Sequence, residues 1–420
     1  MSKTVAAPET DGRRLILVTQ WFDPEPTFKG LLFARALQER GFLVEVVTGF
    51  PNYPGGELYS GYRLRPMKRE TIDGVQVTRL ALYPSHGQSA AGRIINYASF
   101  MISAFVYLTF VARRADVVYV YHPPVTVGIA AATARIFRKF PLVLDIQDMW
   151  PESLTATGMI KSRAILSFVN YVCVWVYKIA SQVVVLSPGF ATLLEDKGVP
   201  ASKISVIYNW ADLASVTKQN SARALHPHAS GRFQILFAGN MGKAQALDTV
   251  IEAAKLLLAK NAQIDFVMLG GGIEVARLKK RVGDEKISNV HFLSSVPMKD
   301  VGNYIQSADA LLVHLKDDPL FRITVPSKTQ AYMAAGKPVI MAVAGDAAEI
   351  IEKADCGIIA APENPYALAQ AAIDLAALPE ETRASMGISG RAYYDRNLSL
   401  QSGVRAFEKI FLKARIEKRR

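Results

Sequence analysis

Two short segments in the second half of the chain carry residues suited to binding a phosphate-bearing ligand. In the first, FAGNMGKAQ (237–245), Gly239 and Gly242 let the backbone approach a ligand closely, and Lys243 supplies a positive charge at the start of the next predicted helix. A nucleotide diphosphate is bound by such cations, by backbone amides and by helix N-termini. An ordinary glycine-rich turn between a strand and a helix is the alternative interpretation.

The second segment is Pro326-Ser327-Lys328, at the start of a predicted helix over residues 326–335. Proline suits the first turn of a helix, a serine hydroxyl can cap it, and lysine adds charge where the helix dipole already attracts anions. The two segments together predict a diphosphate site that contains two lysines. Arg322 lies just before the second segment. It is interpreted either as a contact to the sugar or phosphate of the ligand or as a solvated charge in a loop.

Two carboxylates follow an apolar run in the first half of the chain. Asp145 and Asp148 belong to DIQDMWPES (145–153), at the end of a predicted strand. A carboxylate there could orient an attacking hydroxyl or stabilise positive charge that develops on a sugar. Asp148 is the preferred candidate, because Asp145 could instead be a buried, hydrogen-bonded structural residue.

Alternating strands and helices must position these residues. The sequence predicts buried strands over residues 14–22 and 43–49 with a helix between them over 31–41. Together they form a β-α-β unit. The same alternation restarts at residue 233. It predicts an α/β protein with two Rossmann-like, doubly wound parallel sheets. Ligands of such sheets bind at the carboxyl ends of the strands, so a cleft between two domains is the expected site.

The predicted division of the chain follows from composition. A polar, mixed segment over 211–231 has the character of a connection between domains. The predicted parts are a disordered leader over residues 1–14, a first domain over 15–215 and a second domain over 216–390 that binds the nucleotide. A C-terminal helix over 391–420 is predicted to pack back toward the first domain.

Composition narrows the class of protein. The only cysteines, Cys173 and Cys356, lack metal-ligand spacing, which argues against a zinc site or a disulfide framework and suits a reducing compartment. The first fourteen residues contain no apolar stretch, so no conventional secretory signal is expected.

Positive charge is concentrated in one part of the first half. The chain has a formal charge of +12, and residues 61–114 hold eight basic and two acidic residues. This patch suggests contact with phospholipid headgroups or a phosphate-bearing substrate, although general solubility is the alternative. The uncharged run 94–112 lies inside this basic patch. It has three interpretations: a helix that spans the membrane, a helix that is buried or forms a dimer, or a helix that lies at the membrane interface. The adjacent basic residues favour the interfacial helix.

Five segments resemble motifs of glycosyltransferase family 4, in the order in which that family has them. They are VYHPPVTVGIAA (120–131), DIQDMWPES (145–153), VIYNWAD (206–212), ILFAGNMGKAQALDTVIEAAKLL (235–257) and PSKTQAYMAAGKPVIM (326–341). The chain is most similar to bacterial transferases that build O-antigen or capsule repeats, of the fucosamine-transferase kind. The resemblance implies the GT-B fold, in which two Rossmann-like domains face each other across a cleft.

The resemblance also implies further donor contacts. Asn240 stands where relatives often have arginine, and Ser295 and Val296 would touch the base through backbone groups. Lys29 and Gly30 fall in the first loop, which touches the diphosphate in relatives.

Two glutamates of the family are absent from this chain. Ile323 and Ala331 occupy their positions, so the two carboxylates that contact the ribose in relatives are missing. Gln330 is the substitute candidate.

The implied chemistry is transfer with retention of anomeric configuration, without a metal or a cofactor other than the nucleotide-sugar donor. Lys243 and Lys328 would stabilise a departing diphosphate, and the donor would be a UDP-sugar. The acceptor would be a glycan on polyprenyl diphosphate, used by a cytoplasmic enzyme bound peripherally to the inner membrane; no nucleic acid partner is expected. Two alternatives remain open: a UDP-sugar 2-epimerase-like isomerase and a non-catalytic, membrane-associated partner.

Overall fold

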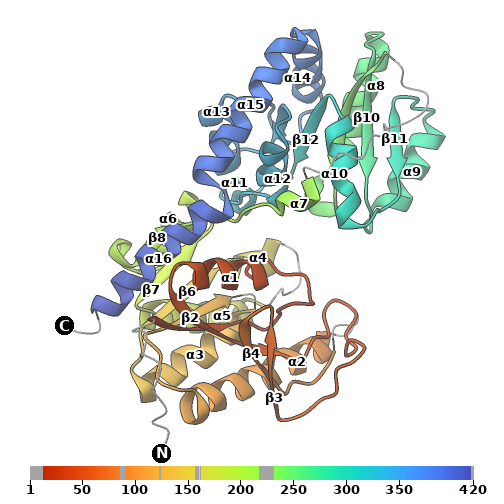
Figure 1. The fold of residues 1–420 in the computed structure, drawn as a ribbon. Helices are drawn as coiled ribbons and strands as arrows, with labels where there is room; N and C mark the ends of the chain where they lie inside the picture. The colour runs from red at the N-terminus through yellow and green to blue at the C-terminus, as the bar shows by residue number, and fades with distance from the viewer. Residues whose placement is uncertain are drawn as a thin grey trace, which may run out of the picture. The chain divides into compact units, whose positions relative to one another are not determined.

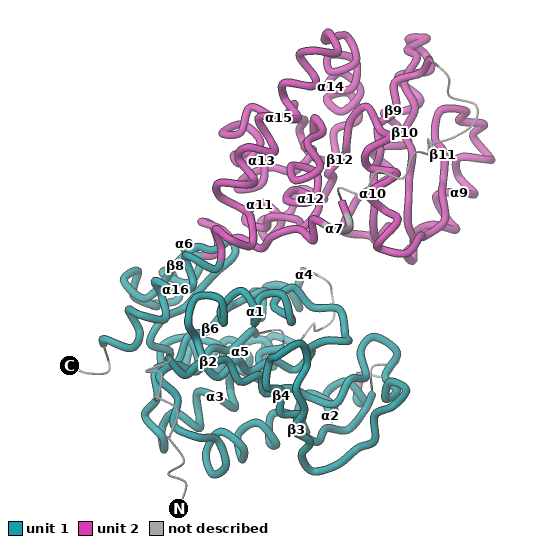
Figure 2. Tube along the Cα trace, viewed as in Figure 1, with its two compact units in different colours: residues 1–186, 191–207, 404–420 teal, residues 187–190, 208–403 magenta. Residues whose placement is uncertain are grey.

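The computed structural model of the protein describes residues 13–85, 90–122, 124–156, 160, 162–216 and 231–417. The chain divides into two compact units (Figure 2). The first contains Met1–Leu186, Ala191–Ile207 and Val404–Arg420, and the second contains Ser187–Phe190 and Tyr208–Gly403. Each unit is an α/β structure around one sheet (Figure 1).

The first unit is built on an eight-stranded sheet in the order β3-β4-β2-β1-β5-β6-β7-β8. Every neighbouring pair is parallel except β3 and β4, which run antiparallel at one edge. The strands are β1 (Arg13–Val18), β2 (Phe42–Gly49), β3 (Met67–Ile72), β4 (Val75–Leu80), β5 (Val117–His122), β6 (Leu142–Ile146), β7 (Gln182–Val185) and β8 (Ile204–Val206).

Two layers of helices cover this sheet. The connection from β1 to β2 crosses the sheet in one direction, and those from β4 to β5, β5 to β6 and β6 to β7 cross in the other. Because such crossovers are right-handed, α1 covers one face, and α2, α3 and α5 cover the opposite face. The helical segments are α1 (Leu31–Glu39), α2 (Ala90–Val106), the π-helical turn η1 (Tyr107–Val111), α3 (Val125–Arg138), α4 (Glu152–Ala156), α5 (Arg163–Ile179), α6 (Pro188–Asp196), η2 (Ala201–Lys203) and α16 (Leu400–Glu417).

The second unit has an all-parallel sheet of six strands in the order β11-β10-β9-β12-β13-β14. Numbered within the unit, this is the 3-2-1-4-5-6 order of the Rossmann fold. The strands are β9 (Phe233–Ala238), β10 (Ile264–Leu269), β11 (Val290–Leu293), β12 (Ala310–His314), β13 (Val339–Ala342) and β14 (Gly357–Ile359). The helical segments are α7 (Leu213–Val216), η3 (Lys243–Gln245), α8 (Asp248–Ala259), α9 (Val275–Asp284), α10 (Met298–Ser307), α11 (Pro319–Arg322), α12 (Ser327–Ala335), α13 (Asp346–Ala354), α14 (Pro365–Ala377) and α15 (Glu380–Asn397).

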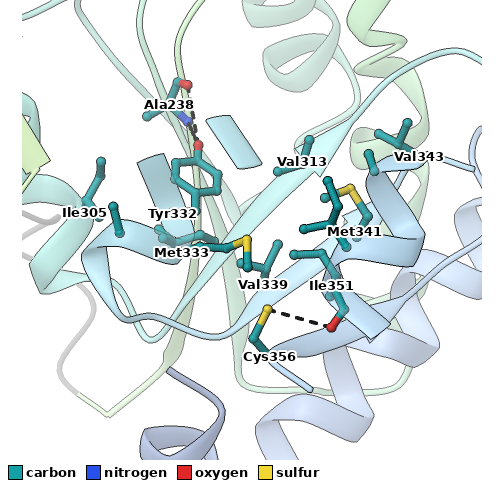
Figure 3. Packing of buried hydrophobic residues seen from close by; sticks show 14 of the residues in the cluster. Ala238, Ile305, Val313, Tyr332, Met333, Val339, Met341, Val343, Ile351 and Cys356 are labelled. Carbon is teal, nitrogen blue, oxygen red and sulfur yellow. Dashed lines mark hydrogen bonds between the residues drawn. The ribbon is translucent and has the colours of Figure 1, made fainter. Parts of the chain in front are cut away.

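The core of the second unit fixes helix α12 against the sheet (Figure 3). Tyr332 and Met333 of α12 are fully buried beside Val339 and Met341 of β13. The Tyr332 hydroxyl also accepts a hydrogen bond of 2.9 Å from the amide of Ala238, the last residue of β9. Helix α12 is therefore held close to the end of β9.

The predicted fold class is confirmed, with two Rossmann-like parallel sheets. Sequence analysis missed β3, whose sequence MKRETI alternates exposed and half-buried residues at an edge of the sheet. The predicted leader lies outside the described residues except for Arg13 and Arg14, which begin β1. Most of the predicted connection, 217–230, also lies outside them. The C-terminal segment forms two helices, and Val404–Arg420 groups with the first unit.

Candidate functional site

In the second unit, the loops after β9 and β10 touch through their backbones. The amide of Gly239 donates to Leu269 O at 2.8 Å, and that of Met241 donates to Gly271 O at 2.7 Å. Gly270 has φ +137° and Gly272 φ +143°, and a Cβ at either position would overlap the backbone of Gly239 or Met241. Only glycine fits such close approaches at positive φ.

Lys328 lies over the end of β9 beside Gly239. A Cβ built on Gly239 would be 2.8 Å from Cε and 3.2 Å from Nζ of Lys328. The same Nζ is 4.4 Å from the centroid of the Phe237 ring. Burial lowers the pKa of Lys328 to about 8, and no carboxylate among the described residues forms an ion pair with it. A desolvated cation next to an exposed glycine is suited to binding an anion.

Lys243 is placed differently from the prediction, which had it at the start of the following helix. Helix α8 begins only at Asp248, and Lys243 lies exposed on the three-residue 3₁₀ segment η3. The Gly242 amide donates to Oε1 of Gln245 at 2.9 Å, which forms a separate short turn. Asn240 is also exposed, and its Nδ2 lies 3.1 Å from a Cβ built on Gly242.

The beginning of α12 also differs from the prediction. Pro326 is the N-cap residue, Ser327 is the first helical residue, and no side chain caps the helix, so the expected hydroxyl cap is absent. Gln330 is buried, and with its amide oriented to satisfy its neighbours Nε2 donates to Pro326 O at 2.8 Å and to Ser327 O at 3.2 Å. These bonds use the Gln330 amide within the first turn of the helix.

Arg322 is engaged with a residue of its own loop. Its guanidinium pairs with Asp317, with Nε to Oδ1 at 2.9 Å, and this ion pair lowers the pKa of the Asp317 carboxyl group. Both side chains are exposed. The neighbouring Ile323, at the position of a family glutamate, packs against Gly189.

Ser295 and Val296 lie in the loop after β11. Ser295 is exposed, and its Oγ is 2.9 Å from a Cβ built on Gly271. Val296 is half-buried against the core that contains α12. The loops after β9, β10 and β11 therefore adjoin at the carboxyl ends of their strands, where ligands of parallel sheets bind.

In the first unit, Asp145 is fully buried in a network of polar side chains. Its Oδ2 accepts a hydrogen bond from the Tyr119 hydroxyl at 2.5 Å and lies 3.9 Å from Nζ of Lys29, and its Oδ1 accepts from Nε2 of Gln147 at 2.6 Å. Burial raises the pKa of Asp145, although Lys29 opposes this shift. Burial lowers the pKa of Lys29 to about 8.

The loop before α1 explains the adjoining glycine. The Leu31 amide donates to Oδ2 of Asp23 at 2.7 Å, and a Cβ on Gly30 would overlap that carboxylate. Gly30 thus permits a local turn, and Lys29 is enclosed, with its Nζ 5.3 Å from the centroid of the Phe407 ring.

Asp148 has a different environment from Asp145. Its side chain is accessible to solvent, yet enough protein surrounds it that burial raises the pKa of its carboxyl group. Its charge contributes to the raised pKa of Tyr97 and Tyr121. Asp148 is therefore the carboxylate that a ligand can reach.

Sequence analysis missed a group of aromatic residues near Asp148. Trp21 follows β1, Tyr53 follows β2, and Tyr97 belongs to α2; all three are half-buried. The Trp21 ring lies 4.8 Å from that of Tyr53 and 6.3 Å from that of Tyr97, between centroids. The available signal was an aromatic residue three or four positions after the end of each of two buried strands.

A buried amide network supports these aromatic residues. Nε2 of Gln20 donates to Oδ1 of Asn96 at 2.6 Å, and Nδ2 of Asn96 donates to Oδ1 of Asn52 at 3.2 Å. Glu25 accepts from the amides of Asn52 and Tyr53 at 2.7 and 2.8 Å, and burial raises its pKa to about 7. The loops after β1 and β2 and the start of α2 are thereby joined. No group of three or more potential metal-ligating side chains occurs among the residues that the structure describes.

Both halves of the chain match family models of glycosyltransferases. Residues 31–210 match the glycosyl transferase 4-like domain, and residues 218–393 match the glycosyl transferases group 1 model. WbjE of Pseudomonas aeruginosa, named as a glycosyltransferase, is 27% identical over 280 residues, covering 65% of this chain and 69% of WbjE. WcaI of Escherichia coli, named as a colanic acid biosynthesis glycosyl transferase, is 25% identical over 394 residues, covering 88% and 92% of the two chains.

The fold also matches solved structures. HepE of Anabaena, in complex with UDP, superimposes with a TM-score of 0.66 at 16% identity, covering 94% of this chain and 98% of HepE. With the Rossmann strand order in the second unit and transferase models that match both halves, the chain is a glycosyltransferase of the GT-B class.

Proposed function

We propose that this enzyme transfers an N-acetylamino sugar from a UDP-sugar, with retention, to a glycan carried on polyprenyl diphosphate, in surface polysaccharide synthesis. The observation that carries the donor site is the desolvated ammonium of Lys328 beside Gly239, which has no carboxylate partner among the described residues. The names of WbjE and WcaI and the UDP bound to HepE support the class of donor and the pathway.

The residues of the second unit would bind the leaving group. Lys328 would neutralise a phosphate oxygen of UDP, and exposed Lys243 would approach from the short turn after Gly242. Backbone amides of the three adjoining loops would hold the rest of the diphosphate and the base. Positive charge that binds departing UDP more tightly than intact donor lowers the barrier to transfer.

In the transfer step, an acceptor hydroxyl oxygen forms a bond to the anomeric carbon while the bond from that carbon to the diphosphate oxygen breaks. The hydroxyl proton passes to the departing diphosphate, so the products are the extended glycan and UDP. Asp148 would orient the acceptor hydroxyl from the first unit. Neither a metal nor a further cofactor takes part in this scheme.

The acceptor glycan would contact the aromatic residues of the first unit. Flat, half-exposed rings suit the apolar face of a pyranose, and neighbouring polar groups suit its hydroxyls. Trp21, Tyr53 and Tyr97 offer such rings close to Asp148. Use of a lipid-linked acceptor would place the enzyme on the cytoplasmic face of the inner membrane as a peripheral protein.

A nucleotide screen by thermal unfolding tests the donor site. UDP and UDP-sugars should raise the melting temperature, because a ligand stabilises the folded state that binds it. ADP and GDP should raise it less, because the proposed donor is a uridine nucleotide. Lys328→Met should abolish the UDP-dependent shift. Release of UDP only when a lipid-linked acceptor is present would support the transferase. Interconversion of the donor without acceptor would instead indicate the isomerase, and the absence of any nucleotide-dependent shift would refute the proposal.

A further inference from the structure

The helices that cover one face of the first sheet leave a large apolar surface exposed. Eleven large hydrophobic side chains that are exposed among the described residues lie on α2, η1, α3 and α5, whereas the described part of the second unit exposes four. On α2 and η1 they include Ile94 (66% exposed), Ile102 (59%) and Phe110 (74%). Soluble proteins rarely leave so many apolar side chains together in water without a partner.

These residues form one layer. Helix α3 packs against α2, η1 and α5. The rings of Phe105 on α2 and Phe137 on α3 meet at 6.2 Å, and Phe137 is 64% exposed. Helix α5 continues the surface with Phe168 (68% exposed) and Tyr171 (72%), and only three of its seventeen residues are buried.

The charge of this layer has one sign. None of α2, η1, α3 and α5 contains an aspartate or a glutamate. Basic residues stand at their ends: Arg93, Arg113, Arg114, Lys139 and Arg163. An apolar surface bordered by cations matches an anionic phospholipid bilayer, in which acyl chains lie beneath negative headgroups.

A small cavity at the end of η1 lies among three arginines. It is lined by Arg113, Arg114 and Arg138, together with Leu108 and Phe140. Arg138 is anchored by hydrogen bonds to the carbonyls of Thr109 and Ala112 at 2.8 and 3.0 Å. Three arginines beside apolar side chains suit contact with headgroup phosphates at the level of the membrane surface.

The segment Ala91–Val111 is long and apolar enough to cross a bilayer, but its inner face belongs to the fold. Asn96, Phe100 and Tyr107 are buried, and Asn96 is hydrogen-bonded to Gln20 and to Tyr83 O. A helix fixed to a sheet in this way can place only its outer face in lipid.

We propose that the outer faces of α2, η1, α3 and α5 form a docking surface for an anionic phospholipid bilayer, with the Arg113-Arg114-Arg138 cavity at its edge. The purpose of this docking rests on the proposed function, because the opposite side of α2 carries Asn96 and Tyr97 to the residues that would bind the acceptor glycan. The same helix would thus contact the membrane and the glycan that emerges from it.

Vesicle flotation of the full chain tests this surface. The protein should float with phosphatidylcholine vesicles that contain phosphatidylglycerol, and binding should weaken as salt rises. Arg113→Gln with Arg114→Gln should lower the partition coefficient by about 25-fold, at about fivefold for each charge. Ile102→Gln with Phe110→Gln, and Phe168→Gln with Tyr171→Gln, should each lower it by about tenfold or more.

A matched control comes from the second unit, where Tyr366 and Ile388 are 73% and 71% exposed. Tyr366→Gln with Ile388→Gln should leave flotation unchanged. Equal binding to neutral vesicles without salt dependence would overturn the proposal. Flotation that stays unchanged in the variants of α2, η1 and α5 would also overturn it. So would a protein that binds no vesicles and forms a dimer that Ile102→Gln with Phe110→Gln dissociates.

Release of UDP in the presence of a detergent-solubilised lipid-linked acceptor, measured on the same preparations, separates the two hypotheses. UDP release without flotation would reject only the docking surface. Flotation without UDP release from any UDP-sugar would reject the proposed transferase reaction and leave the docking surface standing.

Discussion

Lys328 occupies the space that a side chain at residue 239 would need: a Cβ on Gly239 would lie 2.8 Å from Cε and 3.2 Å from Nζ of the lysine. Gly239 also has φ +134°, a conformation that favours glycine. The two residues lie 89 positions apart and come together because the Tyr332 hydroxyl holds α12 to the end of β9.

Gly239→Ala should therefore weaken UDP binding about tenfold or more, because the new methyl group displaces Lys328 and strains the loop. Isothermal titration calorimetry measures the change. Gly231→Ala is the matched control, because Gly231 has φ +92° and open space around its Cβ position. UDP affinity that survives Gly239→Ala would contradict the placement of the diphosphate next to Lys328.

The affinity for UDP should fall above pH 8. Burial lowers the pKa of Lys328 to about 8, so above that pH the free enzyme loses the charge that would bind phosphate. The dissociation constant should then rise about tenfold per pH unit, until the higher pKa of Lys328 in the complex is reached. Titrations from pH 6.5 to pH 10 should show this rise only in a protein that retains Lys328; a flat profile would remove Lys328 from the site.

Stability should change with pH in the opposite direction. Between pH 8 and the ordinary lysine value of 10.5, the unfolded chain binds more protons than the folded one, so the free energy of unfolding rises with pH. Lys328→Met should remove this contribution and stabilise the ligand-free protein at pH 7. Urea denaturation at pH 7 and pH 9.5 measures both effects.

The two carboxylates of the first unit should behave differently on substitution. Asp145→Asn leaves Lys29 buried without its counter-charge, so we expect the loss of about 3 kcal/mol of stability. Asp148→Asn should leave stability nearly unchanged, because Asp148 is exposed, and should lower kcat about 100-fold. Denaturation and steady-state kinetics on both variants distinguish the roles; full turnover in Asp148→Asn would exclude it from the reaction.

Trp21→Ala should raise KM for the acceptor about tenfold and leave KM for the UDP-sugar unchanged, because the ring lies in the first unit beside Tyr53 and Tyr97. Trp21→Phe should restore much of the acceptor affinity by restoring a flat ring. A change in donor KM, with no change for the acceptor, would show that the aromatic group has another role.

Much of the fold was readable from periodicity, because buried parallel strands appear as apolar runs and helices as amphipathic ones. The helix predicted over 31–41 and the strand predicted over 43–49 match α1 (Leu31–Glu39) and β2 (Phe42–Gly49) to within two residues. Strand β3 was not readable, since an exposed edge strand carries polar residues and is fixed only by its pairing with β4. Lys243 was misplaced relative to α8, because the Gln245 side chain folds back on Gly242 and starts a separate turn.

By itself, the sequence determined the two α/β sheets and the glycine- and lysine-bearing loops after their strands, because strand and helix periods and turn residues are local properties. The tertiary structure alone decided which polar groups are enclosed and which are reachable. It buried Asp145 with Lys29 and left Asp148 open, brought Lys328 to Gly239, and put the apolar sides of α2 and α5 outside the core. Desolvation, which sets the pKa values and the exposed surface, depends on packing between residues far apart in the chain, and no local pattern contains it.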